Sequence, residues 1–462
     1  MRTQTGDRRS TLAVLCLAQL LALPALARPQ VKLPHVTLPE TETPTDVPPQ
    51  LRLLSLADAE RMARENQPQL RVSRAATAAA KGRTAQIHTG YLPQVSGLVQ
   101  YQRSTGNFAP RPGTVVPVTS TVSLAPSYDL FNVSVQASQL VYDFGQIADR
   151  QASAEAAEDV LQWTEKTTEL QVVAGARRAY FQARAQKALL DVARETLANQ
   201  RRHLKQIGGF VAAGTRPEID LVQGRTTVSN AQVGVISAQN AYDIGRAQLN
   251  QAIGLMGEID YDVGDDEQRP VEGEDASQQA LLDKAIAARP ELVALDRQRR
   301  QQELTLRAIH NTLWPTIAVT AGVTDVGVNA LNLVPNWNMG ATLNWPIFQG
   351  GLAKAQEAEA NANLAAVAGQ NGVQLLQIQS DIAQARLAVR AAKATIVASD
   401  DALTNATELL RLAEARYLAG VGNGIELSDT QLAYTNAAVQ VIAARYNLST
   451  ARAQLLAALG LP

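Results

Sequence analysis

The clearest pattern in this chain is an alternation of apolar and polar residues in its second half. Every second residue there is apolar, at Trp337, Met339, Ala341, Leu343 and Trp345, and the residues between them are asparagine, glycine or threonine. A period of two places one set on each face of a β-strand. We therefore expect strands at about residues 315–325 and 336–347. A similar alternation predicts strands at about residues 92–103 and 130–142 in the first half.

A second periodicity, of seven residues, runs through two longer segments. In the second segment the stripe consists of Leu375, Ile382, Val389, Ile396, Leu403, Leu410 and Tyr417, with mostly small residues three positions later. Such heptads are typical of helices that pack side by side. They predict long helices at about residues 145–210 and 351–418. The stretch from Gly145 to Gln206 alone would span roughly 90 Å at 1.5 Å per residue.

Each predicted long helix ends at a glycine, after which the chain turns back. Gly214 and Gly420 follow the periodic runs, where glycine commonly closes a helix, and acidic residues then favour the start of a returning helix. The predicted tips are residues 211–221 and 419–427. The return helices are expected to reach residues 253 and 459, so the tips lie at the opposite end of the helices from the strands.

An internal repeat organises these elements. Residues 142–254 align with residues 348–460 at a constant offset of 206 positions, which pairs Gly214 with Gly420 and Gly254 with Gly460. The repeat predicts two halves of one plan, at residues 51–254 and 276–462, joined by a linker at residues 255–275. The predicted fold class is mainly α-helical, with a two-fold internal repeat, long coiled-coil helices and four strands in each chain.

The N-terminal 27 residues have the pattern of a secretory signal peptide. Arginines precede an apolar run and the small-residue site Ala25-Leu26-Ala27. The one cysteine, Cys16, lies inside that run without a small residue before it, which disfavours a lipid anchor. Residues 28–50 are rich in proline and predict an extended tether. After Leu23 the sequence predicts no transmembrane helix.

The strand segments of the second half are almost free of charge. Only Asp325 is charged between Arg307 and Lys354. Trp337 and Trp345 are about 26 Å apart in a strand, close to the spacing of the aromatic girdles of outer-membrane barrels. Because four strands cannot close a barrel and unpaired edges are not tolerated in lipid, three copies are expected to share a twelve-stranded barrel. A soluble sandwich or a soluble helical rod is the alternative.

Most chemical functions are disfavoured by the sequence. The four histidines, His35, His88, His203 and His310, are scattered without metal-ligand spacing, so no metal site is expected. No phosphate-binding loop or nucleophile motif is present, so neither a cofactor nor an enzyme activity is expected. A net charge of -1 argues against a nucleic-acid partner.

One acidic pair lies at the second tip. Glu426 and Asp429 are three residues apart at the start of a helix and therefore share a face. One interpretation is that they are favourable charges at a helix N-terminus. The other is that a threefold assembly turns them into a ring of carboxylates that lines a constriction and selects cations.

Several of these features together resemble a known family. They are the two-half plan, the strand-to-helix junctions at residues 142–146 and 346–351, the paired tips, and the Arg-Ala-Gln-Leu segments at residues 246–249 and 452–455. The chain resembles the outer-membrane factors, the TolC-like export ducts, from Leu54 to Gly460. The resemblance implies a homotrimer with a twelve-stranded barrel in outer-membrane lipid and a twelve-helix periplasmic tunnel. It also implies a periplasmic adaptor and an inner-membrane pump of the RND, ABC or MFS type as partners.

The resemblance also assigns roles to residues. It implies that Glu426, Asp429 and Asp220 belong to the channel constriction. It implies an adaptor-docking region in the tips, made of Gly214, Thr215, Arg216, Pro217, Gly420, Val421, Gly422, Asn423 and Gly424. Trp337 and Trp345 are the expected membrane girdle. Gly422 and Gly424 predict a flexible second tip.

The predicted function is passive conduction of exported molecules from pump and adaptor to the exterior. The same architecture serves small-molecule efflux and type I protein secretion, so both remain candidates. The alternative from another class is a coiled-coil scaffold or adhesin in the periplasm or at the surface, which the heptads alone also fit.

Overall fold

The computed structural model describes residues 52–105, 127–257 and 259–461. The predicted signal peptide (1–27) and tether (28–50) lie outside the described residues. Most of the described residues are helical, and the strands form two sheets. None of the helices in this part of the chain is long and apolar enough to cross a membrane.

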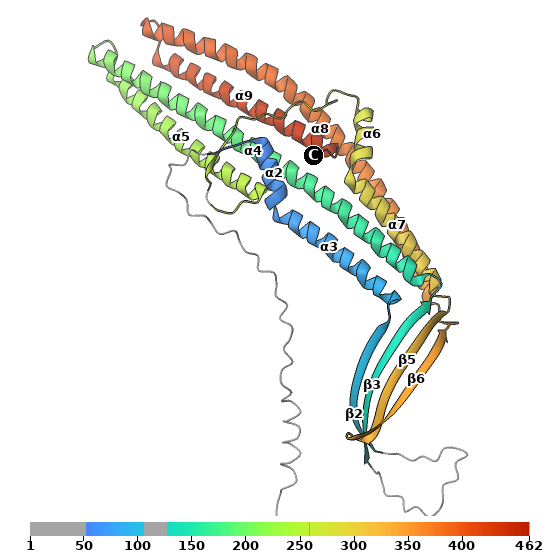
Figure 1. Ribbon diagram of the computed structural model, residues 1–462. Helices are drawn as coiled ribbons and strands as arrows, with labels where there is room; N and C mark the ends of the chain where they lie inside the picture. Colours follow the sequence, from blue (N-terminus) through green and yellow to red (C-terminus); the bar gives the residue numbers. More distant parts are fainter. Residues whose placement is uncertain (1–51, 106–126, 258, 462) are drawn as a thin grey trace, which may run out of the picture. The chain divides into compact units, whose positions relative to one another are not determined.

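Both halves contain the same succession of elements (Figure 1). The first half consists of α2 (Leu56–Asn66), α3 (Pro68–His88), β2 (Gln94–Thr105), β3 (Ser127–Tyr142), α4 (Gln146–Ala212) and α5 (Glu218–Ile253). The second half consists of α6 (Gln278–Ala288), α7 (Pro290–Asn311), β5 (Thr316–Asn329), β6 (Asn332–Asn344), α8 (Leu352–Leu418) and α9 (Gly424–Ala458). The short turn η1 (Thr89–Tyr91) precedes β2. The predicted internal repeat is confirmed.

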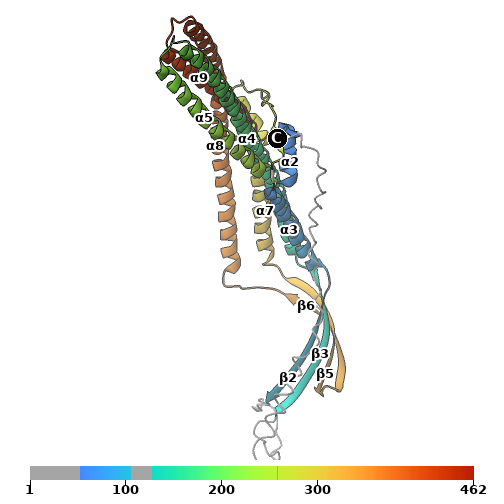
Figure 2. The same ribbon diagram turned by 90° about the vertical axis from the view of Figure 1, so that its left-hand side faces the viewer.

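Four strands form one antiparallel sheet in the order β2-β3-β5-β6, in which they lie side by side (Figure 2). Residues directly opposite one another share a face. Val135, Val323 and Trp337 form one such row across β3, β5 and β6, on the apolar face that the alternation predicts. β2 and β6 are the edge strands, so each has one backbone side unpaired within the described sheet.

The second hairpin is longer than the sequence suggested. β5 and β6 continue to a tight turn near Leu331, so the predicted break between residues 325 and 336 is wrong. Pro335 pairs opposite Asp325 inside β6. Proline donates no N–H group, but an edge strand tolerates it where that position faces away from the ladder. At its other end β6 stops at Asn344 rather than at residue 347.

The two longest helices have 67 residues each, which is about 100 Å at 1.5 Å per residue. α4 packs along α5 and α8 along α9, and a contact between α4 and α9 joins the two hairpins. The small residues of the α8 heptad are all buried, and they are Ala385, Ala392, Ser399, Ala406 and Ala413. Of the larger stripe, Ile382, Val389 and Tyr417 are buried, whereas Leu375 is exposed. Small side chains therefore account for much of the helix packing.

The core consists mainly of two apolar clusters between the helices. One surrounds Tyr180 and Phe181 of α4, and the other surrounds Ile382 of α8 and Leu455 of α9. Where α5 crosses α4, a β-carbon on Gly245 would lie 3.3 Å from the Ala183 Cα. Backbones that approach this closely leave little room for rings, which agrees with an aromatic content of 4%.

The repeat is also visible at the C-terminal ends of the return helices α5 and α9. Gly254 ends α5 with φ 74°, and its equivalent Gly460 follows α9 with φ 72°. A β-carbon on Gly254 would lie 2.8 Å from the Asn66 backbone, and one on Gly460 would lie 3.1 Å from the Arg289 Cα. Asn66 and Arg289 lie just before α3 and α7. Each return helix therefore ends against the upstream helices of its own half.

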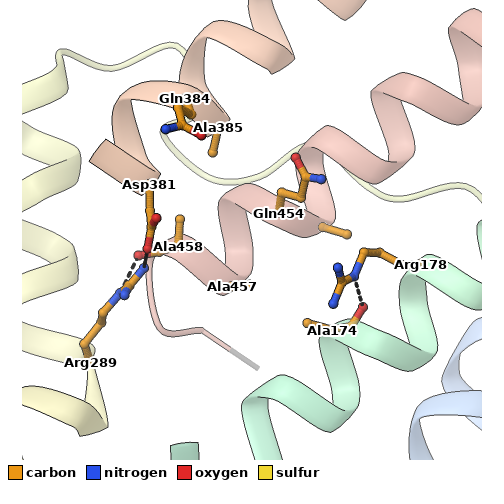
Figure 3. A pocket seen from close by; sticks show the side chains of 10 residues that line it. Ala174, Arg178, Arg289, Asp381, Gln384, Ala385, Gln454, Ala457 and Ala458 are labelled. Atoms are coloured by element: carbon orange, nitrogen blue, oxygen red, sulfur yellow. Dashed lines mark hydrogen bonds and ion pairs between the residues drawn. The ribbon is translucent and has the colours of Figure 1, made fainter. Parts of the chain in front are cut away.

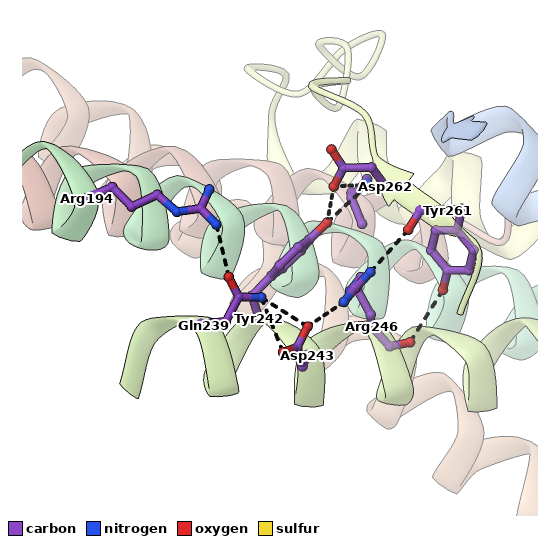
Figure 4. Close-up of polar contacts among 8 residues, drawn as sticks. Arg194, Gln239, Tyr242, Asp243, Arg246, Tyr261 and Asp262 are labelled. Atoms are coloured by element: carbon purple, nitrogen blue, oxygen red, sulfur yellow. Dashed lines mark hydrogen bonds and ion pairs between the residues drawn. The ribbon is translucent and has the colours of Figure 1, made fainter. Parts of the chain in front are cut away.

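The linker contains a strand that the sequence did not reveal. β4 (Tyr261–Val263) pairs in parallel with β1 (Arg52–Leu54). Figure 4 shows the polar contacts around it. The Tyr242 hydroxyl of α5 donates to the Asp262 carboxylate, and Arg246, which also pairs with Asp243 of its own helix, donates to the Tyr261 carbonyl. A strand of three residues has no periodicity to detect, so only its partners define it.

A buried carboxylate fixes the other end of the linker. Glu274 accepts hydrogen bonds from Arg452 of α9 at 3.0 and 3.1 Å and lies 2.7 Å from Lys393 Nζ of α8. Burial alone raises the pKa of Glu274, but hydrogen bonds from Arg452, Lys393 and the Val271 N–H outweigh it and lower this pKa to about 2. This one ionised side chain therefore ties the linker to both helices of the second hairpin.

Two glycines with the same backbone conformation test the importance of close packing. Alanine in the left-handed region costs roughly 1–2 kcal/mol, and Gly214→Ala should lose about that much, because Gly214 (φ 73°) faces open space. Gly254→Ala should lose clearly more, because the Asn66 backbone must also move. Thermal unfolding of the purified variants measures both, and equal losses would contradict the packing argument.

The Glu274 contacts predict a pH-dependent stability. The pKa of Glu274 falls from an ordinary 4.5 to about 2 on folding, so its contribution is fully present above pH 4.5 and is lost as the pH falls towards 2. Glu274→Gln should cost on the order of 3 kcal/mol at pH 7 and much less near pH 2.5. Unfolding midpoints across this range measure the difference, with exposed Glu272→Gln as the control that should stay near wild type.

Candidate functional site

The first predicted tip is a turn closed by glycine. α4 ends at Ala212, and Gly214 adopts the left-handed conformation that glycine favours. The N–H and the hydroxyl of Thr215 both donate to the Phe210 carbonyl, at 3.0 and 2.9 Å. Pro217 then precedes α5, whose first turn carries Asp220. Backbone hydrogen bonds and the Thr215 hydroxyl therefore hold the turn.

The second tip repeats this backbone with different side chains. Gly420 has φ 75°, and the N–H groups of Val421 and Gly422 both donate to the Arg416 carbonyl, at 3.1 and 3.0 Å. A β-carbon on Gly422 would lie 3.0 Å from the Tyr417 nitrogen. Glycine at position 422 therefore allows a close approach to the end of α8.

The start of α9 is capped by a side chain. The Asn423 side-chain oxygen accepts the Glu426 N–H at 2.7 Å, and Gly424 is the first residue of the helix. Asparagine is among the best residues for this position. Asn423 therefore sets the direction in which Glu426 and Asp429 leave the tip.

The two tips contact one another through Arg216. Its Nη2 donates to the Gly422 carbonyl at 2.9 Å, and its guanidinium carbon lies 4.8 Å from the centre of the Tyr417 ring. Arg216 and Gly422 are equivalent positions of the repeat. Phe210 and Leu427 pack against Tyr417. Burial raises the pKa of the Tyr417 hydroxyl, while the Arg216 charge acts in the opposite direction.

The three predicted constriction carboxylates have different surroundings. Glu426 Oε1 lies 3.1 Å from Arg416 Nε in a partly exposed ion pair. Asp429, one turn further along α9, is exposed and forms no ion pair with the residues that the structure describes. Asp220, the repeat equivalent of Glu426, is half-buried and lines a small cavity between the hairpins. The site is therefore a mixture of paired and free charges.

Two residues of this site were missed in the sequence. Arg416 was not singled out, and Tyr417 was assigned only to the heptad. The available signal was a basic residue in the last turn of α8, where it also suits the helix dipole. Its partner Glu426 lies on the next helix, so spacing along the chain could not identify the pair.

The second face of the four-stranded sheet is polar and uncharged. Ser134 and Thr324 belong to one row of this face, and the next row consists of Ser96, Gln136, Gly322 and Asn338. Among the described residues of β2, β3, β5 and β6, this face holds no Asp, Glu, Lys or Arg. Its polar side chains are therefore neutral donors and acceptors, with apolar residues such as Leu98 and Val326 between them.

The two predicted girdle residues are exposed. Trp337 lies on the apolar face of β6, and Trp345 directly follows this strand, where its indole N–H donates to the Leu313 carbonyl at 3.2 Å. A second aromatic group, which the sequence did not reveal, lies where the strands meet the helices. There Trp314 stacks on Phe144 with ring centres 5.3 Å apart, and Phe144 contacts Tyr142.

A cleft of about 360 Å³ lies between α4 and the α8–α9 pair (Figure 3). Its arginines are already bonded. Arg289 donates to the Ala458 carbonyl at 2.8 Å and to Asp381 at 3.2 Å, and Arg178 donates to a carbonyl of its own helix. The Arg289 contacts join the start of α7 to α9 and α8, whereas the Arg178 contact stays within α4. Within residues 52–105, 127–257 and 259–461, no group of three His, Cys, Asp or Glu residues is placed to hold a metal ion.

The chain matches the family model described as outer membrane efflux protein over residues 60–255 and 281–461, which correspond to the two halves of the repeat. A probable efflux pump outer membrane protein of Pseudomonas putida, SepC, is 24% identical over 64% of this chain and 62% of its own length. The chain therefore spans less than two thirds of that relative. The outer membrane efflux protein BepC of Brucella suis is 23% identical over 85% of this chain and 84% of its own length.

Solved structures show the same fold. The outer-membrane channel OprN is 16% identical, with a TM-score of 0.72 over 88% of this chain and 90% of its own. The CmeC outer membrane channel of Campylobacter jejuni is 14% identical, with a TM-score of 0.74 over 88% and 85%. The predicted fold class, family resemblance and outer-membrane location are confirmed. The chain belongs to the outer membrane efflux protein family.

Proposed function

We propose that this chain is one subunit of a passive export duct in the outer membrane. The observation that carries the proposal is the four-stranded sheet, with one mainly apolar face, one uncharged polar face and two unpaired edges. The charged residues of the apolar face, Arg103, Asp129 and Asp325, lie at the end of the sheet near the β5–β6 turn. Three copies, joined β6 to β2, would close twelve strands with the polar face around a water-filled lumen. The four long helices of each copy would continue this lumen as a twelve-helix periplasmic tunnel.

The tips are proposed as the periplasmic entrance of the duct. In a threefold assembly Glu426 and Asp429 would form a carboxylate ring, and Asp220 would lie behind it. The Arg216 contact to Gly422 would hold the hairpins of one copy together at this level. Residues 214–217 and 420–424 are exposed for the most part, which suits docking of a periplasmic adaptor that connects the duct to an inner-membrane pump.

The relatives favour small-molecule efflux over type I protein secretion as the proposed role. SepC and BepC are both named as efflux proteins. Nothing in this role requires catalysis or a cofactor. The alternative, a coiled-coil scaffold or adhesin, accounts only for the helices and does not explain the apolar face of the sheet.

Adjacent residues of β3 test which face meets water. The mature protein would contain no cysteine if the predicted signal peptide is removed with Cys16. Ser134→Cys lies on the polar face and Val135→Cys on the apolar face. In native outer membranes a charged, water-soluble thiol reagent should label Ser134→Cys at least tenfold faster than Val135→Cys, because the reagent dissolves in water and not in lipid. Equal labelling rates would contradict the duct and suit a soluble scaffold.

The carboxylate ring predicts the ion selectivity of the duct. In planar bilayers the wild type should show discrete conductance steps with a preference for cations. Glu426→Gln combined with Asp429→Asn should move the cation-to-anion permeability ratio towards 1, as measured by the reversal potential in a salt gradient. Arg416→Gln, which frees Glu426 from its ion pair, should raise the ratio instead. If both variants conduct with the ion selectivity of the wild type, Glu426 and Asp429 serve only as favourable charges at the helix N-terminus.

A further inference from the structure

A small cavity lies where the two helical hairpins meet behind the tips. Its volume is about 40 Å³, and its wall contains residues of α4, α5, α8 and α9. Tyr417 and Leu427, from the apolar cluster between the tips, form part of the wall. Asp220 of the first hairpin also faces it. Each of the four long helices therefore contributes to the wall of this cavity.

Three buried polar atoms in this wall have no hydrogen-bond partner among the described residues. They are the Tyr417 hydroxyl oxygen, His203 Nδ1 and Gln431 Nε2. Tyr417 is 2% exposed and Gln431 is 8% exposed. Buried polar atoms are nearly always bonded to protein or to ordered water, so three orphans around one cavity indicate that something inside it bonds them.

The other polar atoms of these side chains are already in use. Gln431 Oε1 accepts a hydrogen bond from Gln200 Nε2 at 2.6 Å. His203 Nε2 lies 3.4 Å from Glu414 Oε1. Both contacts cross from the first hairpin to the second and fix the orientation of the two side chains. The unpartnered nitrogen of each is thus the one left for a ligand.

The size and the chemistry of the wall identify the ligand. A water molecule needs about 10–15 Å³ of such volume, so this cavity takes a few waters and no organic molecule. The wall offers the Gln431 N–H as a donor, the Asp220 carboxylate as an acceptor and the Tyr417 hydroxyl as either. Water can donate to one and accept from another, whereas a metal cation would be repelled by the N–H donor.

We propose that this cavity is a structural water site that joins the two hairpins of one copy. Its waters bridge His203 and Asp220 of the first hairpin to Tyr417 and Gln431 of the second. Bridging water can exchange partners when the helices shift, so the hairpins can move here without leaving buried polar groups unpaired. The site does not depend on the proposed function, because it lies within a single chain.

The direction in which one substitution changes the melting temperature tests the proposal. Tyr417→Phe removes only the hydroxyl and keeps the ring beneath Arg216. If water occupies the cavity, the variant leaves that water without one of its hydrogen-bond partners. The melting temperature of the purified full chain should then fall by a few degrees. If the cavity is dry, the variant removes an unsatisfied group, and the melting temperature should stay the same or rise; either result overturns the proposal. Tyr434→Phe, whose hydroxyl reaches Glu195 only at 3.5 Å, is the matched control and should have little effect.

A high-resolution crystal structure of the full chain provides the second readout. Density about 3 Å from at least two of the three orphan atoms, and weaker in Tyr417→Phe, is the expected result. An empty cavity would overturn the proposal even if the variant melts early. Anomalous scattering at the site after a rubidium soak would also overturn it, because a cation and not water would then be the ligand.

Discussion

The backbone edges of β2 and β6 impose the condition on which the rest of the structure depends. Each edge presents a row of N–H and C=O groups without a partner in the described sheet. In hydrocarbon each unpaired group costs several kcal/mol, so a sheet with an apolar face enters a membrane only when another chain covers its edges. In the assembly proposed above, the uncharged polar face lines the lumen because lipid takes the apolar face.

The same condition extends to the two longest helices, because α4 is the next element after β3 and α8 is the next element after β6. Gly145 and Gly351, at φ 85° and 86°, make the turns from β3 into α4 and from β6 towards α8. The buried Asp143 carboxylate accepts the N–H groups of Gly145 and Ile147 at the first of these turns. Strand positions thereby fix helix positions. Helices of 67 residues placed this way must support one another along their length, and stripes of alanine and serine allow that approach.

Elements with a strong period were predictable, and contacts between distant residues were not. The heptads of α8 and the alternation in β6 identify these elements, since each residue repeats the same signal. The extension of β6 through Pro335 was not predictable, because whether a strand tolerates proline depends on its place in the sheet. β4 has three residues and is defined only by β1. The site divides in the same way: spacing along α9 pairs Glu426 with Asp429, whereas Arg416 reaches Glu426 only across the folded tip.

The internal repeat explains why the two tips differ. Equivalent positions meet where the hairpins touch, and two large side chains cannot occupy the same place. At Arg216 and Gly422 one copy of the repeat supplies the guanidinium and the other supplies a bare carbonyl. A β-carbon at 422 would crowd Tyr417, so glycine there is the counterpart of arginine at 216. Asp220 and Glu426 also differ in their surroundings, because Asp220 lines the cavity between the hairpins and Glu426 pairs with Arg416. The two tips therefore share a backbone conformation, but the contact between them is asymmetric because each hairpin contributes different charged residues.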